Sequence, residues 1–514
     1  MKPFIQLTLA TVFTCTVAAS AWSASVAKGI VFHDKNGNGE SNGGEDRLAG
    51  VAVSNGVDVV QTDLKGRYEI PVTEDTIVFV VKPSGWRTPQ SDTGISRFYY
   101  NHKPAGSPRL EAKYPTIEPT GKLPRHIDFP LYPQKEPDTF KMIAFGDTQP
   151  RNQQEVDYIA HDVVQELVGF EAAFGITLGD VVFNNLSLYK PLEQLLATIG
   201  VPWYNVHGNH DLNLKSPDDA NSDETWEYYY GPSYYSFDYG QVHFVNLDDI
   251  AWNGEGYHGE LGANQLAFLK NDLALVPKDK LVVLMMHIPL TSIDDKEAVY
   301  DILDGHPNNF SISAHWHRQA HYFVDEEGGW KGEGEHHHLV HATVCGSWWS
   351  GVVDENGIPH ATMADGAPNG YSIVTFSGSD YSIRFKAARR SADHQMNIYA
   401  PEVIQSADAS NTQIVANVFA GSERSTVEMR LGESGDWTKM VLTPMADPYY
   451  AKMKALEPLM PKEAGRTLPN TANSTHIWTA NLSGTPPPGL HLIHVRTTDM
   501  FGQTYTDQRS IRVE

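Results

Sequence analysis

The sequence is poor in cysteine, in basic residues and in long apolar runs. It holds two cysteines, Cys15 and Cys345, and Cys15 lies in the N-terminal apolar stretch. Once that stretch is removed no intrachain disulfide can form, and the scarcity of thiols argues against a structural zinc cluster. Lysine and arginine number 39 against 63 aspartate and glutamate residues, a formal net charge of −24. This balance argues against general binding to nucleic acid or anionic membrane, although a local cluster of cations can still hold a small phosphate.

No apolar run beyond residue 23 approaches the length of a membrane span. The N-terminal run itself, Phe4 to Ala19, follows Lys2 and precedes small residues around Ala21 and Ser23. This order predicts a secretory signal over residues 1–23. The alternative is a membrane anchor, which the shortness of the run and its small-residue flank disfavour. We expect an exported protein, periplasmic or secreted, without a transmembrane segment after cleavage.

The rest of the chain divides into regions of different patterning, and its 514 residues are expected to form about two to four domains. Short β-branched and aromatic runs between turn residues predict β-sandwich domains over residues 24–136 and 386–514. Residues 137–385 between them have the pattern of an α/β body. Residues 90–136, rich in proline, lysine and tyrosine, have the composition of a linker. The C-terminal region carries no recognisable chemistry, so packing or ligand binding are its open roles.

The first β region contains one candidate calcium loop. Its oxygen donors are Asp34, Asn36, Asn38 and Glu45, at the spacing of positions one, three, five and twelve of such loops, and Gly39 permits the tight bend. No helical pattern flanks the loop, so it resembles the calcium loops of bacterial β modules rather than an EF-hand. An Asn- and Gly-rich turn without an ion is the alternative.

Polar residues follow five short apolar runs of the α/β body. In chain order these residues are Asp147, Asp180, Asn209 with His210, His287, and His315 with His317. Segments of helical spacing separate the runs, and residues 234–247 have the pattern of an antiparallel hairpin. The alternation predicts a partly parallel sheet whose polar groups meet at the carboxyl ends of its strands. Mixed oxygen and nitrogen donors of this kind suit divalent ions such as Mn, Fe or Zn.

The order of these blocks resembles that of the calcineurin-like metallophosphoesterase family. The blocks are Gly146-Asp147-Thr148-Gln149, Gly179-Asp180, Gly208-Asn209-His210-Asp211, His287 and His315-Trp316-His317. The flanking β regions are similar to those of a bacterial exported subgroup with N-terminal and C-terminal β domains. The resemblance implies an α/β (α+β) fold, in which a metallophosphoesterase β-sandwich core carries flanking helices.

The resemblance also implies a role for each polar residue. Asp180 would bridge two divalent ions (Mn, Fe or Zn), one completed by Asp147 and His317 with Gln149 at or near it. The other ion would be completed by Asn209, His287 and His315, while His210 would face a small phosphoester substrate. A metal-bound hydroxide would attack a phosphomonoester or phosphodiester, with His210 protonating the leaving group or stabilising charge.

One departure from the family supports a rival hypothesis. Gln149 stands where many relatives have histidine, and an amide oxygen is the weaker ligand. A non-catalytic cell-envelope binding protein with a vestigial metal site is therefore the alternative.

Further candidates lie towards the end of the body. Trp348, Trp349 and Asn369, in stretches similar to the subgroup's catalytic tail, are candidate substrate contacts, although the tryptophans can equally plug a loop. His336–His338 are expected in a loop, either near the phosphate site or solvated. Cys345 is expected to be inert in its apolar context. The sequence leaves the substrate and the oligomeric state open.

Overall fold

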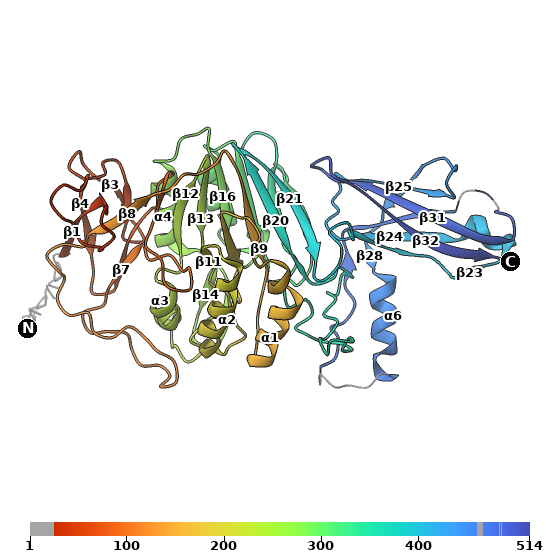
Figure 1. The fold of residues 1–514 in the computed structure, drawn as a ribbon, viewed down its shortest axis with the longest axis horizontal. Helices are drawn as coiled ribbons and strands as arrows, with labels where there is room; N and C mark the ends of the chain where they lie inside the picture. The colour runs from red at the N-terminus through yellow and green to blue at the C-terminus, as the bar shows by residue number, and fades with distance from the viewer. Residues whose placement is uncertain (1–24, 460–465, 483, 485) are drawn as a thin grey trace, which may run out of the picture.

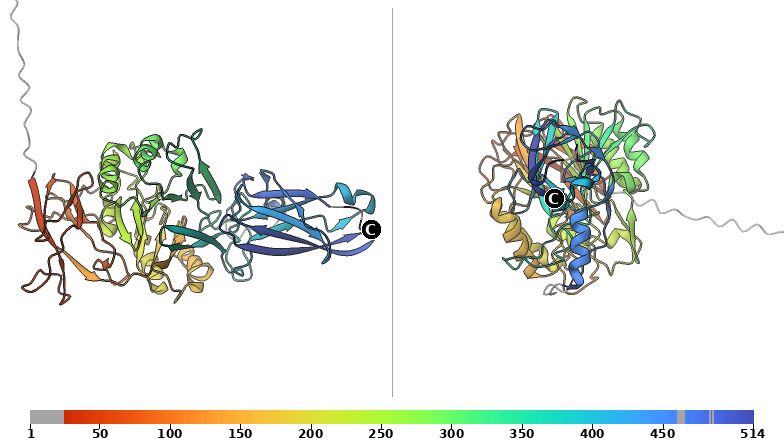
Figure 2. Two further views of the ribbon diagram at one scale, coloured as in Figure 1. Left: turned by 90° about the horizontal axis from the view of Figure 1, so that it is seen from above. Right: turned by 90° about the vertical axis from the view of Figure 1, so that its right-hand side faces the viewer.

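The structure is a computed structural model that describes residues 25–459, 466–482, 484 and 486–514. The predicted signal peptide, residues 1–23, lies outside the described residues. Three regions follow one another along the long axis of the molecule: an N-terminal β region, a central α/β region and a C-terminal β region (Figures 1 and 2). Among the described residues, no helix has the length and apolarity needed to cross a membrane.

The N-terminal region consists of two four-stranded sheets whose buried side chains share one core. The strand orders are β4-β1-β8-β6 and β3-β2-β5-β7. Their bounds are β1 Ser25–His33, β2 Ala52–Ser54, β3 Val59–Gln61, β4 Arg67–Val72, β5 Thr76–Val80, β6 Trp86–Arg87, β7 Tyr99–His102 and β8 Phe129–Pro133. The stretch with linker composition thus contributes β7 and β8. Buried Phe129 and Leu131 alternate with prolines in β8, which hid the strand pattern.

Two sheets face each other in the central region, as the fold prediction required. The five-stranded sheet has the order β11-β10-β9-β20-β21 and the six-stranded sheet β12-β13-β16-β17-β19-β18. The bounds are β9 Thr139–Phe145, β10 Phe174–Thr177, β11 Trp203–Asn205, β12 Tyr235–Tyr239, β13 Val242–Asn246, β14 Ile250–Trp252, β15 Tyr257–Gly259, β16 Leu281–Met285, β17 Asn309–Ser313, β18 Ala320–Val324, β19 His336–Val340, β20 Gly370–Ser377 and β21 Asp380–Ala387. Strands β9, β10 and β11 are parallel, as are β13, β16, β17 and β19. The expected hairpin forms as β12–β13.

Phenylalanine side chains from both sheets meet in the space between them. Phe140 and Phe174 of the first sheet contact Phe244 of the second at ring-centroid distances of 6.4 and 5.2 Å. Helices cover the outer faces: α1 Gln153–Asp162, α2 Tyr189–Leu196, α3 Glu224–Tyr230, α4 Gly262–Leu273 and α5 Lys296–Leu303. Helices α1 and α2 share a buried cluster with the outward side chains of β9, and α4 and α5 pack with the six-stranded sheet. This arrangement leaves the carboxyl ends of the parallel strands at one open edge.

The C-terminal region repeats the β pattern around a core of its own. Its sheets have the orders β22-β24-β30-β27 and β23-β32-β31-β25-β26. The bounds are β22 Met396–Tyr399, β23 Val403–Ile404, β24 Gln413–Val418, β25 Thr426–Leu431, β26 Thr438–Lys439, β27 Val441–Leu442, β28 Met445–Ala446, α6 Pro448–Leu456, β29 Asn473–Ser474, β30 Ile477–Asn481, β31 Gly489–Thr498 and β32 Thr504–Val513. Helix α6 projects from the sandwich alongside the central region (Figure 1).

Candidate metal centre

The loops that follow β9, β10, β11, β16 and β17 meet at the open edge of the central region. They carry, in that order, Asp147, Asp180, Asn209, His287 and His315. Parallel strands end at the same edge of a sheet, so groups 168 residues apart in the sequence, the His315 backbone N–H and the Asp147 carboxylate, come into contact here. The convergence expected from the sequence is therefore present in the structure.

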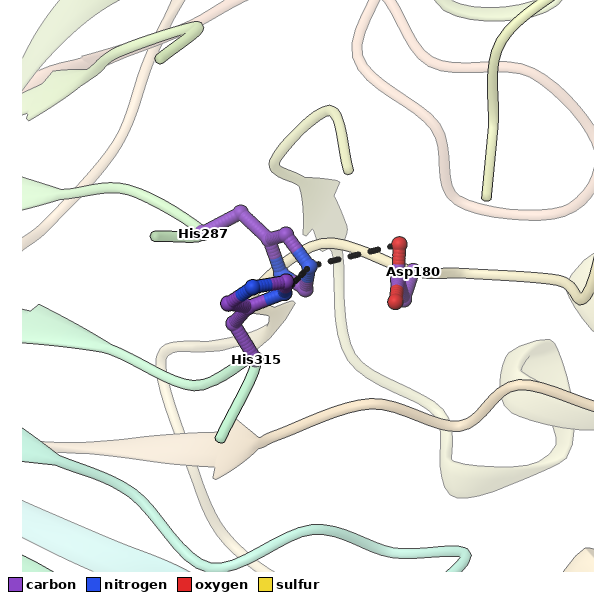
Figure 3. Close-up of side chains that lie close together, drawn as sticks. All are labelled: Asp180, His287 and His315. Atoms are coloured by element: carbon purple, nitrogen blue, oxygen red, sulfur yellow. Dashed lines mark hydrogen bonds and ion pairs between the residues drawn. The ribbon is translucent and has the colours of Figure 1, made fainter. Parts of the chain in front are cut away.

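One half of the centre is built around His287. Its Nε2 lies 3.1 Å from His315 Nδ1 and 3.3 Å from Asp180 Oδ1 (Figure 3). The same atom lies 3.2 Å from Asn209 Oδ1. The other ring nitrogen of His287, Nδ1, lies 2.8 Å from the Leu178 carbonyl, which fixes the ring. The ligand atoms of Asp180, His287 and His315 all fall within 4.8 Å of one another, a spacing that one cation can span.

The other half is built around Asp147 and His317. The Asp147 Oδ2 atom lies 3.0 Å from His317 Nε2, and the Gly346 carbonyl holds His317 Nδ1 at 2.5 Å. Gln149 Nε2 lies 2.5 Å from Asp180 Oδ2. The two carboxylate oxygens of Asp180 therefore face different halves of the centre, Oδ1 towards His287 and Oδ2 towards Gln149.

The backbone of this centre is held in a conformation that side chains rarely adopt. Gln149, Asp180, His315 and His317 all have positive φ values, of 41°, 47°, 64° and 49°. Each such residue costs about 1–3 kcal/mol, and strain of this kind gathers at functional sites. The strained conformation turns these four side chains towards a common point.

Two glycines allow the loops that carry Asp180, Asn209 and His287 to pack against one another. A Cβ atom on Gly208 would lie 2.1 Å from the Asp180 backbone nitrogen, and one on Gly179 would lie 2.3 Å from His287 Nδ1. Gly208 serves close approach rather than a left-handed turn, whereas Gly179 serves both, with a φ of 84°.

Charge is strongly coupled across the centre. Burial favours the neutral form of Asp180, but the charge and hydrogen bond of His287 outweigh it and hold the Asp180 pKa below its usual value. Burial likewise lowers the pKa of His287, and Asp180 raises it to about 10. Burial, followed by the charge of His287, lowers the pKa of His315 to about 4. The buried Asp180 carboxylate thus stays charged and needs a positive partner. Next to it lie imidazole and amide groups that can donate electron pairs, a combination that fits divalent cations.

His210 lies beside the centre. Its backbone N–H donates to Asp180 Oδ1 at 2.8 Å, and its Nδ1 lies 2.8 Å from Asn184 Oδ1. The ring stacks on Phe183 at a centroid distance of 4.0 Å. Asn184 is in turn held by the Tyr114 hydroxyl, which donates to its carbonyl at 3.0 Å, so the N-terminal region supports this imidazole indirectly.

Three aspartates near the centre hold backbone N–H groups or an imidazole outside the candidate ligand set. Asp211 accepts backbone N–H groups of Val181, Val182 and Gly208. Asp249 Oδ1 accepts the backbone N–H of His287 at 3.3 Å, and Asp248 contacts His207 at 3.1 Å. Backbone carbonyls, rather than carboxylates, orient the imidazoles of His287 and His317.

The candidate substrate contacts are distributed differently. The Trp348 ring lies 3.9 Å from the His317 ring, directly at the centre. Trp349 is buried and packs against Tyr158, so it plugs the loop. The Asn369 side chain donates to Asp162 and the Val344 carbonyl, and it lines a cavity of about 530 Å³ to which none of the metal-centre side chains contributes.

His336–His338 do not form a loop. They constitute most of strand β19 and are buried. His336 and His338 share the Ser311 hydroxyl at 2.6 and 2.7 Å, and His338 also contacts Ser313 at 3.0 Å. A tertiary network of imidazoles and hydroxyls satisfies these polar rings, which is why a run of three histidines nevertheless lies in an inner strand.

The candidate calcium loop is exposed and largely closed on itself. Asp34 accepts the backbone N–H groups of Gly37 and Gly39, at 2.7 and 2.8 Å. Glu45 accepts those of Lys35 and Asn42. Asn36 and Asn38 both donate side-chain N–H groups to Asn42 Oδ1.

Several neighbours of the centre carried no sequence signal of their own. Cys345 is buried, with its Sγ 3.6 Å from Gln149 Oε1, and its N–H donates to the Asp147 carbonyl at 3.1 Å. Cys345 thus belongs to an apolar cluster, as expected, while its Sγ also lies near polar groups of the centre. Asn184, Phe183 and Gly346 contact the site residues only through tertiary packing.

A buried polar network joins the C-terminal region to the centre. Asp365 Oδ2 accepts the backbone N–H of Gln319, two residues beyond His317, and lies 3.1 Å from His476 Nε2. Asn417 contacts His476 Nδ1 at 2.7 Å and donates to the Asp365 carbonyl at 3.0 Å. Groups from β24 and the start of β30 thus fix a loop of the central region.

Family models match three successive parts of the chain. The model described as calcineurin-like phosphoesterase matches residues 140–319, which include the whole ligand set. Models for the N terminal and C terminal of calcineurin-like phosphoesterase match residues 35–113 and 337–505. The chain belongs to the calcineurin-like phosphoesterases. This calcineurin-like phosphoesterase is thus a hydrolase of phosphoric ester bonds that uses divalent metal ions, and the family predicted from the five blocks is confirmed.

Likenesses to solved structures are weak. A purple acid phosphatase from yellow lupin (Lupinus luteus) seeds matches at 12% identity with a TM-score of 0.36, over 66% of this chain and 66% of its own. A superoxide reductase (neelaredoxin) from Ignicoccus hospitalis matches at 14% identity with a TM-score of 0.14, over 24% of this chain and 81% of its own. No curated protein matches the chain.

Proposed function

We propose that the protein is an exported, dinuclear metallophosphoesterase that hydrolyses a small phosphomonoester or phosphodiester, such as a nucleotide, a sugar phosphate or an envelope phosphoester. The observation that carries the proposal is the Asp180 carboxylate, whose two oxygens face His287 and Gln149 on opposite sides. Export is supported by the signal-like order of residues 1–23.

The ligand set suits two sites of mixed donors. Asp147, His317 and the Gln149 amide would hold one ion, and Asn209, His287 and His315 the other, with Asp180 shared. Two divalent cations there would supply Lewis acidity that activates water and neutralises phosphoryl charge. These ligands are nitrogen and oxygen atoms and include no cysteine thiolate, a donor set that fits Mn, Fe or Zn.

His210 is proposed as the catalytic proton donor. Asn184 and Phe183 fix its ring, and its backbone N–H is bound to Asp180, so the imidazole is held at the edge of the centre. An imidazole in this position can protonate a departing alkoxide, or stabilise developing charge as imidazolium.

The test is hydrolysis of p-nitrophenyl phosphate and bis-p-nitrophenyl phosphate by the purified full-length protein with added Mn. We expect turnover of at least one ester, its loss with a chelator, and about two ions per chain by elemental analysis. Absence of metal-dependent turnover on both esters and on a nucleotide and sugar-phosphate panel would refute the proposal.

Calcium in the loop from Asp34 to Glu45 is a separate proposal, supported by the spacing of its oxygen donors. Calorimetric titration with Ca²⁺ tests it, with Asp34→Ala as the comparison. A titration without heat in the native protein would refute it.

A further inference from the structure

A cationic pair lies against the candidate metal centre, and the proposed reaction gives it no role. Arg151 contacts the Phe183 ring and the backbone carbonyl of Trp348, two residues whose rings lie against site imidazoles. Its guanidinium lies 4.5 Å from the Phe183 ring, which stacks on His210. It also donates to the carbonyl of Trp348, whose ring stacks on His317, at 3.0 Å. Arg151 therefore lies beside the centre, between its two imidazole edges.

A second guanidinium reaches the same place from the C-terminal region. Arg466 donates to the same Trp348 carbonyl at 3.4 Å, and its guanidinium lies 3.9 Å from Glu155 Oε1. Arg466 is distant in sequence from the catalytic loops, so the three-dimensional fold alone brings it here. Two side chains from different regions thus converge on one carbonyl at the rim of the site.

The charge of this pair is only partly balanced. Glu155 is the carboxylate that both arginines contact, at 3.3 and 3.9 Å. Burial raises the Glu155 pKa above its usual value, which weakens this carboxylate as a counter-charge. Each guanidinium carries five N–H donors, more than the contacts with Trp348 and Glu155 use. The side chains remain partly exposed, 18% for Arg151 and 34% for Arg466.

We propose that Arg151 and Arg466 form a subsite for a second anionic group of the substrate. This inference rests on the proposed function and narrows its substrate class to phosphoesters that carry another phosphate or carboxylate. The scissile phosphoryl group would lie at the metal centre, and the second group would bind the guanidiniums beyond Trp348 and Phe183. Planar guanidiniums bind phosphate and carboxylate through paired N–H donors, which matches the pair.

The experiment compares two phosphonates that phosphoesterases do not cleave. Propylphosphonate and propane-1,3-bisphosphonate differ in one anionic group, and calorimetry gives their Kd values for the Mn-loaded full-length protein. We expect the bisphosphonate to bind at least about tenfold more tightly, beyond the factor of about two that its two equivalent ends provide. The measured quantity is the ratio of the propylphosphonate Kd to the bisphosphonate Kd. In Arg466→Gln this ratio should fall to about two to three, whereas Arg466→Lys should retain most of the native ratio.

Arg125→Gln is the matched control, because Arg125 is an exposed arginine of the N-terminal region. It should leave the ratio as in the native protein, and chelation of Mn by the bisphosphonate affects all variants equally. A native ratio of about two, or an undiminished ratio in Arg466→Gln with native metal content, would overturn the inference. Failure of the proposed function shows separately, as absence of p-nitrophenyl ester turnover, because phosphonate binding requires no turnover.

Discussion

Two groups of buried histidines lie in or just beyond the same six-stranded sheet, and they differ in what faces them. His287 and His317, beyond the ends of β16 and β17, face Asp180 and Asp147 at 3.3 and 3.0 Å. His336–His338, inside β19, face serine, asparagine and tyrosine side chains and another imidazole. Burial lowers the pKa of every one of these rings, but Asp180 raises the pKa of His287 above its usual value, and Cys345 and Asp147 together raise that of His317. Burial alone therefore does not distinguish the two groups of histidines; the acidic side chains that face His287 and His317 at the candidate metal centre do.

The largest effect is expected from removing the negative charge of Asp180, which both halves of the candidate metal centre face. Asp180→Asn keeps the shape but loses the carboxylate that both halves face, so we expect metal content and p-nitrophenyl phosphate turnover to fall to background. Elemental analysis and initial rates measure both. An Asp180→Asn protein that retained two ions and native turnover would show that the carboxylate is not shared.

Removing the imidazole beside the centre separates binding from chemistry. His210→Ala should lower turnover by about 10²–10⁴-fold, because the leaving group loses its proton donor, while metal content stays near native. His126→Ala, at an exposed histidine far from these loops in the sequence, is the matched control and should change neither. If His210→Ala strips the metals instead, the histidine is a ligand and not a proton donor.

Support of the ligand loop is expected to matter less. Asp249→Asn weakens the acceptor for the backbone N–H groups of His287 and Ile288, at 3.3 and 3.1 Å. Loss of such support typically lowers metal affinity by about 10–100-fold. Titration with a competing chelator measures this affinity. If Asp249→Asn binds metal with native affinity, Asp249 does not support the His287 loop, and the contact of His287 with the Leu178 carbonyl is sufficient.

Substitution of a β19 histidine should lower the stability of the protein and leave its metal content unchanged. His338→Ala leaves the Ser311 and Ser313 hydroxyls without this partner, so we expect a loss of about 1–3 kcal/mol in unfolding free energy. Metal content and turnover of the folded protein should remain native. Urea unfolding and elemental analysis distinguish the two effects, and metal loss at native stability would contradict the comparison.

The smallest effect concerns pH. Burial lowers the pKa of His336 to about 3, so the unfolded chain binds a proton more readily than the folded one below about pH 6.5. Stability is therefore full above that pH and falls on acidification, by less than about 1 kcal/mol for this histidine between pH 7 and pH 6. In His336→Asn the pH dependence of urea unfolding should become correspondingly shallower; an unchanged slope would mean that the ring protonates in the folded state.

The sequence predicted which side chains converge, because strand ends are local features. Apolar runs followed by Asp147, Asp180 and His287 place each side chain at a strand terminus, and parallel order brings the termini together. The roles of Asn184 and Asp249 could not be read in the same way, because they act on backbone or side-chain atoms of distant loops. The sequence pattern predicts a loop for the β19 histidines. Their burial in a strand depends on contacts with Ser311 and Ser313 of the neighbouring strand, which a local pattern does not show.

The Asp365 network has a consequence for how the enzyme can be divided. Cutting the chain after β21 would preserve every metal-ligand candidate, yet it would remove His476 from the buried Asp365 carboxylate and Asn417 from the Asp365 carbonyl. That carboxylate holds Gln319, so the loop bearing His317 would lose its anchor. We therefore expect the smallest active fragment to include the C-terminal sandwich, which holds this loop although it contributes none of the metal-ligand candidates.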